Sequence, residues 1–134
     1  AGSITYAGLG EGTTFVSAPL EEATEITGPI ASKLWISSST EDADLFLVLR
    51  VFAPDFKEIT FMGALDPNTP IAQGWLRASH RKLDENLSLP YRPYHCHDEI
   101  RKIEPHSVTE LEIEIWPTSI ACPPGYRLVL TLQR

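Results

Sequence analysis

Residues 34–54 carry the clearest pattern of hydrophobic and polar positions in the chain. Between residues 45 and 52, apolar side chains fill the odd and the even positions alike, and Arg50 is the single charged residue. Because a strand directs alternate side chains to opposite faces, this run predicts a strand near the middle of a sheet. Residues 34–38 form a second predicted strand. The acidic turn at residues 39–44 joins the two strands at the expected centre of the fold.

Further short segments predict additional strands along the chain. Residues 4–7, 59–64 and 74–78 are weak to moderate strand candidates. Residues 108–116 alternate strictly between apolar side chains and glutamates, which is typical of a strand with one face toward water. The apolar positions there are Leu111, Ile113 and Ile115, and the glutamates are Glu110, Glu112 and Glu114.

The last predicted strand, residues 126–132, places Tyr126, Leu128, Leu130 and Leu132 on an inner face and turns Val129 and Thr131 outward. A final strand with nothing after it to cover it exposes unpaired N–H and C=O groups. We therefore expect self-association into a homo-oligomer through this edge.

The best helical candidate is residues 79–86, and Pro90 and Pro93 end any longer helix there. Residues 89–105 are expected to form an extended crossing segment instead. Residues 19–24 are expected to form a short turn of helix or a loop. The whole pattern of short strands and turns predicts an all-β chain with at most one or two short helices.

Composition limits the domain count and the partners. A chain of 134 residues with 43% hydrophobic content supplies one domain with a sizeable core, so we expect residues 1–134 to form a single domain. Its net charge of -7 comes from dispersed carboxylates with no basic block, which excludes nucleic acid as an expected partner. No apolar run approaches the roughly 20 residues that span a bilayer, so we expect a soluble chain without a membrane partner.

Several blocks of sequence, taken in order, resemble a known family. They are EITGP at residues 25–29, residues 37–45 with two aspartates, GWLRASHR at 74–81, and IEIWPT at 113–118 followed by GYRL at 125–128. Over residues 14–132 their combination resembles the C-terminal domain of the X-Pro dipeptidyl-peptidase and cocaine-esterase group of serine hydrolases. The resemblance implies a jelly-roll β-sandwich, similar to galactose-binding domains, that packs against an α/β-hydrolase domain of the same protein. It implies no catalytic residue in this segment.

The chain departs from that family by lacking a hydrolase domain and by ending before the family's last strands. We therefore expect an excised piece of a larger protein or an atypical, shortened member. The surface that would face the hydrolase domain is then a second expected route to the homo-oligomer. No Gly-x-Ser-x-Gly nucleophile elbow occurs, so this chain alone is expected to have no hydrolase activity. The parent protein is expected to be a serine hydrolase of X-Pro peptides or small esters. No catalytic residue, cofactor or metal is assigned to the chain.

Charged residues in two of these blocks predict a structural ion pair. A half-buried arginine needs a carboxylate, so we expect Asp42 or Asp44 to pair with Arg77 or Arg81. Loss of one partner is costly if the pair is buried and slight if it is exposed. Calcium binding by Glu41 and the two aspartates is the alternative, but the regular spacing of a calcium loop is missing.

A second titratable cluster, His95, Cys96 and His97, invites a zinc or thiol-nucleophile assignment. Neighbouring residues of an extended segment point in opposite directions, so they do not converge easily on one metal. A nucleophilic cysteine would also need a placed base and an oxyanion site. We expect an exposed loop here.

Three tryptophans, Trp35, Trp75 and Trp116, lie on three different predicted strands. Packing in the core or at a domain contact is the expected role, and a sugar-stacking platform is the alternative. The competing function for the chain is therefore an independent carbohydrate-binding module.

Overall fold

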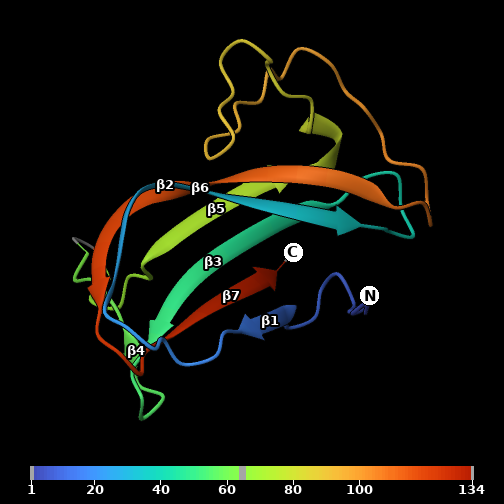
Figure 1. Cartoon of the computed structure of the whole chain (residues 1–134). Helices are drawn as coiled ribbons and strands as arrows, with labels where there is room; N and C mark the ends of the chain where they lie inside the picture. The colour runs from blue at the N-terminus through green and yellow to red at the C-terminus, as the bar shows by residue number, and fades with distance from the viewer. Residues whose placement is uncertain (1, 64–65, 134) are drawn as a thin grey trace. The chain divides into compact units, whose positions relative to one another are not determined.

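A computed structural model describes residues 2–63 and 66–133, and these residues are all-β as predicted (Figure 1). They form seven strands and one 3-10 helix, with no α-helix among them. In chain order the elements are β1 (Thr13–Val16), β2 (Thr24–Ile36), β3 (Asp44–Phe52), β4 (Glu58–Ile59), β5 (Ala72–Arg77), η1 (Ala78–His80), β6 (Thr109–Cys122) and β7 (Arg127–Gln133).

The strands belong to two hydrogen-bonded sheets. One follows the order β1-β7-β3-β4, with β5 also paired to β3, and the other consists of β2 and β6. Strand β3 has neighbours on both sides, which confirms that residues 45–52 lie inside a sheet (Figure 1). The strand exposes Phe46, however, so it is not covered on both faces. The jelly-roll order of connections stays a prediction.

The prediction that residues 126–132 form an uncovered edge strand is wrong. Strand β7 pairs with β1 on one side and lies beside β3 on the other, so its backbone groups have strand neighbours in both directions. Val129 and Thr131, expected to face outward, are each only 4% exposed. Self-association through this strand is therefore not supported, and the oligomeric state itself stays a prediction.

Four other local expectations change. Residues 34–36 end a longer strand, β2, which pairs with β6 and not with β3, and residues 37–38 lie outside any strand. The helix expected at residues 79–86 shrinks to η1, and residues 4–7 form no strand. Of residues 59–64, only the start belongs to a strand, β4, and residue 64 lies outside the described residues.

The fold divides into two compact units. Unit 1 consists of Ala1–Gly28, Leu47–Gln73 and Pro117–Arg134, and unit 2 of Pro29–Phe46 and Gly74–Trp116. In unit 1, the buried residues Val51, Ile71 and Cys122 form a hydrophobic cluster, against which Leu20, Ile120, Tyr126 and Leu128 pack. In unit 2, the buried apolar residues are Leu45, Leu76, Ala78, Ile103, Leu111, Ile113 and Ile115. Whether the chain folds as a single domain stays a prediction.

In unit 2, strict alternation on β5 and β6 determines which side chains reach the surface. The apolar positions of β6 that alternate with its glutamates are at most 2% exposed, whereas the glutamates lie on the other face, as the sequence predicted. Trp116 shares the face of the glutamates. On β5 the outward positions are Gln73, Trp75 and Arg77. A Cβ atom added at Gly74 would overlap the carbonyl oxygen of Glu114 and lie 3.1 Å from the Cα of Ile115. A glycine is therefore required where β5 approaches β6.

Candidate functional site

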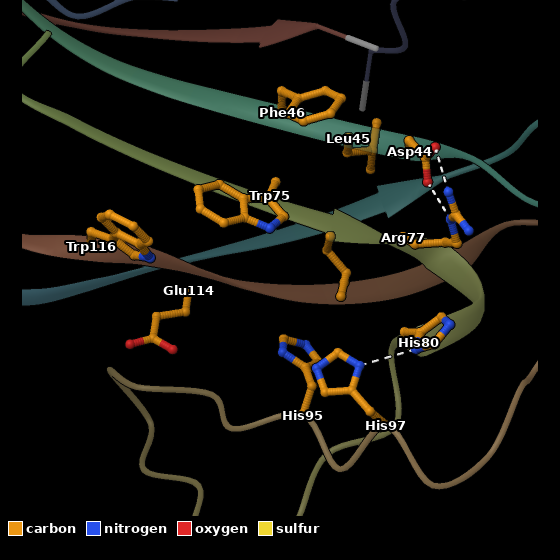
Figure 2. A pocket seen from close by; sticks show the side chains of 11 residues that line it. Asp44, Leu45, Phe46, Trp75, Arg77, His80, His95, His97, Glu114 and Trp116 are labelled. Carbon is orange, nitrogen blue, oxygen red and sulfur yellow. Dashed lines mark hydrogen bonds and ion pairs between the residues drawn. The ribbon is translucent and has the colours of Figure 1, made fainter. Parts of the chain in front are cut away.

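A groove of about 510 Å³ opens on the surface of unit 2 (Figure 2). All of its lining residues belong to this unit. They are Asp44, Leu45 and Phe46 from β3, Trp75, Leu76 and Arg77 from β5, Glu114 and Trp116 from β6, and His80, His95 and His97 from η1 and the loop that follows it. Its volume lies within the range of small-molecule sites.

Aromatic side chains form the apolar part of the groove. The rings of Trp75 and Trp116 have centroids 5.1 Å apart and planes tilted by 55°, a favourable aromatic arrangement. The two tryptophans are 54% and 59% exposed, and Phe46 beside them is 45% exposed. Trp35, at 62%, is equally exposed but does not line the groove. Core packing is therefore the wrong expectation for all three tryptophans, while sugar stacking and domain contact stay predictions.

One side of the groove carries an ion pair between two of the predicted residues. Arg77 donates from Nε to Asp44 Oδ1 at 2.7 Å and from Nη2 to Oδ2 at 3.2 Å (Figure 2). The hydrogen bonds to Asp44, followed by its charge, raise the pKa of Arg77. Both side chains remain well exposed, so the pair orients the arginine more than it stabilises the fold.

Asp42 has a different role. Its Oδ1 accepts the backbone N–H groups of Ala43 and Ser79, both at 2.9 Å, and its Oδ2 accepts the Ser79 hydroxyl at 2.6 Å. Burial alone would raise the pKa of Asp42, but these hydrogen bonds and the charge of Arg77 bring it below its ordinary value. Since Ser79 is only 2% exposed and lies in η1, Asp42 fixes the turn that places His80 in the groove.

Arg81 and Glu41 complete the set of predicted charges, and neither lines the groove. Arg81 donates to the backbone carbonyl groups of Ala78 and Arg101, so no carboxylate partner is found for it among the described residues. Glu41 accepts from Lys102 at 2.8 Å. The acidic turn is thus bound by protein groups, and residues 2–63 and 66–133 contain no cluster of three or more side chains that could hold a metal ion.

Three histidines line the side formed by η1 and its following loop. His95 Nε2 lies 2.8 Å from the carbonyl oxygen of Glu112, which can only accept, so Nε2 carries the hydrogen. Burial lowers the pKa of His95, and the bond to Glu112 offsets part of this effect. Its neutral ring therefore has an unprotonated Nδ1. His80 and His97 face each other with their Nδ1 atoms 3.0 Å apart, so one ring donates to the other (Figure 2).

The glutamates of β6 separate into two groups. Glu110 and Glu112 contact Lys33 at 3.2 and 3.6 Å, as expected for a solvated strand face. Glu114 lines the groove, and its carboxylate lies 4.0 Å from Arg92 Nε, which is too long for a hydrogen bond. Glu114 thus contributes a carboxylate to the groove.

Sequence reasoning missed Phe46, His80, Glu114 and the role of the histidines. The period-two pattern of β5 and β6 contained a usable signal, because Trp75 alternates with buried Leu76 and Trp116 shares the face of the glutamates. The convergence of His80 with His97 had no such signal, since it depends on the path of a loop.

The sequence matches the X-Pro dipeptidyl-peptidase C-terminal non-catalytic domain over residues 8–133. The chain belongs to this family. A candidate serine esterase of Mycobacterium bovis is 28% identical over 127 residues, covering 89% of the chain and 18% of the esterase. The family assignment confirms the resemblance found in the sequence.

Solved structures agree with this family. A CocE/NonD family hydrolase from Staphylococcus aureus is 29% identical with a TM-score of 0.87, covering 91% of the chain and 22% of the hydrolase. An α-amino acid ester hydrolase is 19% identical with a TM-score of 0.64 and shares the fold. The similarity covers 92% of the chain and 18% of that hydrolase. The chain thus spans about a fifth of the length of these relatives. No helix among the described residues is long and apolar enough to cross a membrane.

Proposed function

We propose that this chain is the C-terminal β-sandwich of a serine acyl hydrolase of the X-Pro dipeptidyl-peptidase or ester hydrolase type. In that role it packs against and supports the α/β-hydrolase domain that carries the catalytic triad. The observation that carries the proposal is the match to a non-catalytic C-terminal family over nearly the whole chain, together with relatives about five times as long. The chain itself supplies no catalytic residue.

Unit 1 offers a surface suited to such a contact, at residues 56–62. Four apolar side chains, Phe56, Ile59, Phe61 and Met62, are 64%, 36%, 41% and 87% exposed within this short stretch. Exposed apolar clusters of this kind are typical of interaction sites.

Backbone hydrogen bonds hold the segment at residues 56–62 in place. Ala53 exchanges hydrogen bonds with the segment, since its N–H donates to the Lys57 carbonyl and its carbonyl accepts from Phe56. The N–H and carbonyl of Phe61 both pair with Thr69. The guanidinium of Arg127 lies 5.3 Å from the Phe56 ring centroid, which favours one position of this ring. A surface ordered in advance loses little entropy when a domain docks on it.

The test uses the full-length protein that contains this chain and replaces Met62 by Asp. A charge in an apolar contact should weaken the attachment by about 2 kcal/mol or more. Calorimetry should then show the β-sandwich unfolding separately, at a lower temperature than in the parent. Val108→Asp is the matched control, because Val108 is 71% exposed and lies in unit 2.

Both substitutions should leave the melting temperature of the 134-residue chain unchanged, since both side chains are exposed. Full-length Met62→Asp protein that unfolds like the Val108→Asp control, with Phe61→Asp giving the same result, would contradict docking through this surface.

A further inference from the structure

The groove of unit 2 combines stacking surfaces with hydrogen-bonding groups in a way that docking of a domain does not require. We infer that it is a binding site for a neutral carbohydrate, with Trp75 and Trp116 as the stacking platform. This site shares no residue with the surface at residues 56–62 and does not depend on the proposed function.

The aromatic pair provides the first part of the argument. Trp75 and Trp116 expose more than half of their surface, although an indole left in water sacrifices apolar burial. The face of an aromatic ring carries partial negative charge, which attracts the weakly positive C–H groups on one side of a pyranose ring. Their 55° tilt presents two differently inclined surfaces in one groove, as a bent saccharide chain would need.

The polar groups supply the second part, because the residues that line the groove include both hydrogen-bond donors and acceptors. The indole N–H groups of the two tryptophans are donors, whereas His95 Nδ1 and the Glu114 carboxylate are acceptors. When both rings of the His80–His97 pair are neutral, the ring that donates from Nδ1 has a bare Nε2, and the accepting ring has a protonated Nε2. The pair therefore offers one further donor and one further acceptor.

The charges of the groove favour a neutral sugar over charged ligands of similar size. Arg77 is engaged by Asp44, and Glu114 together with the net charge of -7 disfavours an anion. A cation would be attracted to Glu114 and to the indole faces, but it cannot accept a hydrogen bond, so it would leave the indole N–H donors without a partner. A hydroxyl group both donates and accepts, which matches the mixed lining of the groove.

The test measures binding of neutral disaccharides to the 134-residue chain by isothermal calorimetry and by saturation-transfer NMR. The probes are cellobiose, maltose, lactose and xylobiose, with tetramethylammonium chloride as the cationic comparison. At least one disaccharide should bind saturably, and its ring C–H protons should receive magnetisation from the indole protons. NMR on the unsubstituted chain keeps the test independent of whether a variant folds.

Trp75→Ala and Trp116→Ala should each weaken that binding about tenfold or more, since each removes a stacking surface. Trp35→Ala is the matched control, because Trp35 is as exposed but lies outside the groove, and it should change the affinity less than about twofold. Circular dichroism checks that each variant is folded.

Three results would overturn the inference. They are the absence of saturable binding by every disaccharide, binding of tetramethylammonium alone, and an equal loss of affinity in Trp35→Ala and the two groove variants.

Discussion

Removal of the Asp42 carboxylate should destabilise the chain far more than removal of Asp44, although the two residues are neighbours in one acidic turn. Asp42→Ala leaves the backbone N–H and the hydroxyl of Ser79 without their acceptor, and Ser79 is only 2% exposed. Two buried polar groups left unpaired cost about 3 kcal/mol together. For a chain of this length that loss corresponds to a fall in melting temperature of about 10 °C.

Asp44→Ala is the matched control, because its ion pair with Arg77 is exposed on both sides. Its melting temperature should stay within about 3 °C of the parent. Asp42→Asn should lie between the two, since the amide oxygen can still accept both backbone N–H groups while the negative charge is lost.

Thermal unfolding followed by circular dichroism measures these shifts, and Ser79→Ala in the Asp42→Ala background tests their cause. The double variant should lose less stability than the sum of the losses in the single variants Asp42→Ala and Ser79→Ala, because it leaves no serine hydroxyl unpaired. Equal melting temperatures for Asp42→Ala and Asp44→Ala would refute the reasoning.

Two further predictions concern activity and pH. The 134-residue chain should not hydrolyse p-nitrophenyl acetate, since it contains no nucleophile elbow, and turnover that survives removal of contaminating esterases would contradict this. Burial lowers the pKa of His95 in the folded chain from its ordinary value of 6.5, so below about pH 6.5 the unfolded chain takes up this proton first. Stability from this residue is complete above that pH and is lost as the pH falls toward the folded pKa. His95→Gln should therefore flatten the decline in melting temperature between about pH 7 and 5, and an unchanged slope would exclude His95 as its source.

Strand periodicity carried most of what the sequence revealed about the fold. The buried and exposed sides of β6 follow directly from its alternating residues, and β3 lies between strands as its apolar run predicted. Position in the chain was a poor guide to pairing. Strand β7 is the last strand of the chain, yet it pairs with β1, the first strand, with Thr13 opposite Leu132. A contact between residues so far apart leaves no local pattern.

The site was less predictable because its parts depend on tertiary placement. An ion pair between the acidic turn and the arginines near residue 80 could be expected, but the sequence could not select Asp44 and Arg77 or show that both are exposed. Trp75 and Trp116 were expected in the core or at a domain contact because tryptophan is usually well buried, but both lie on the face that their strands turn outward. The histidines come together only because η1 is short and the following loop folds back on it.

Gly74 bears on how this groove can vary between related proteins or be redesigned. The close approach of β5 and β6 tolerates no side chain at this position, and it is this approach that puts the two indoles next to each other. Residues such as Phe46 and Trp116 can be exchanged to alter which ligand fits while the backbone stays as it is. Any larger residue at position 74 would instead separate the strands, so libraries that seek new specificities should diversify the exposed aromatic positions and keep this glycine.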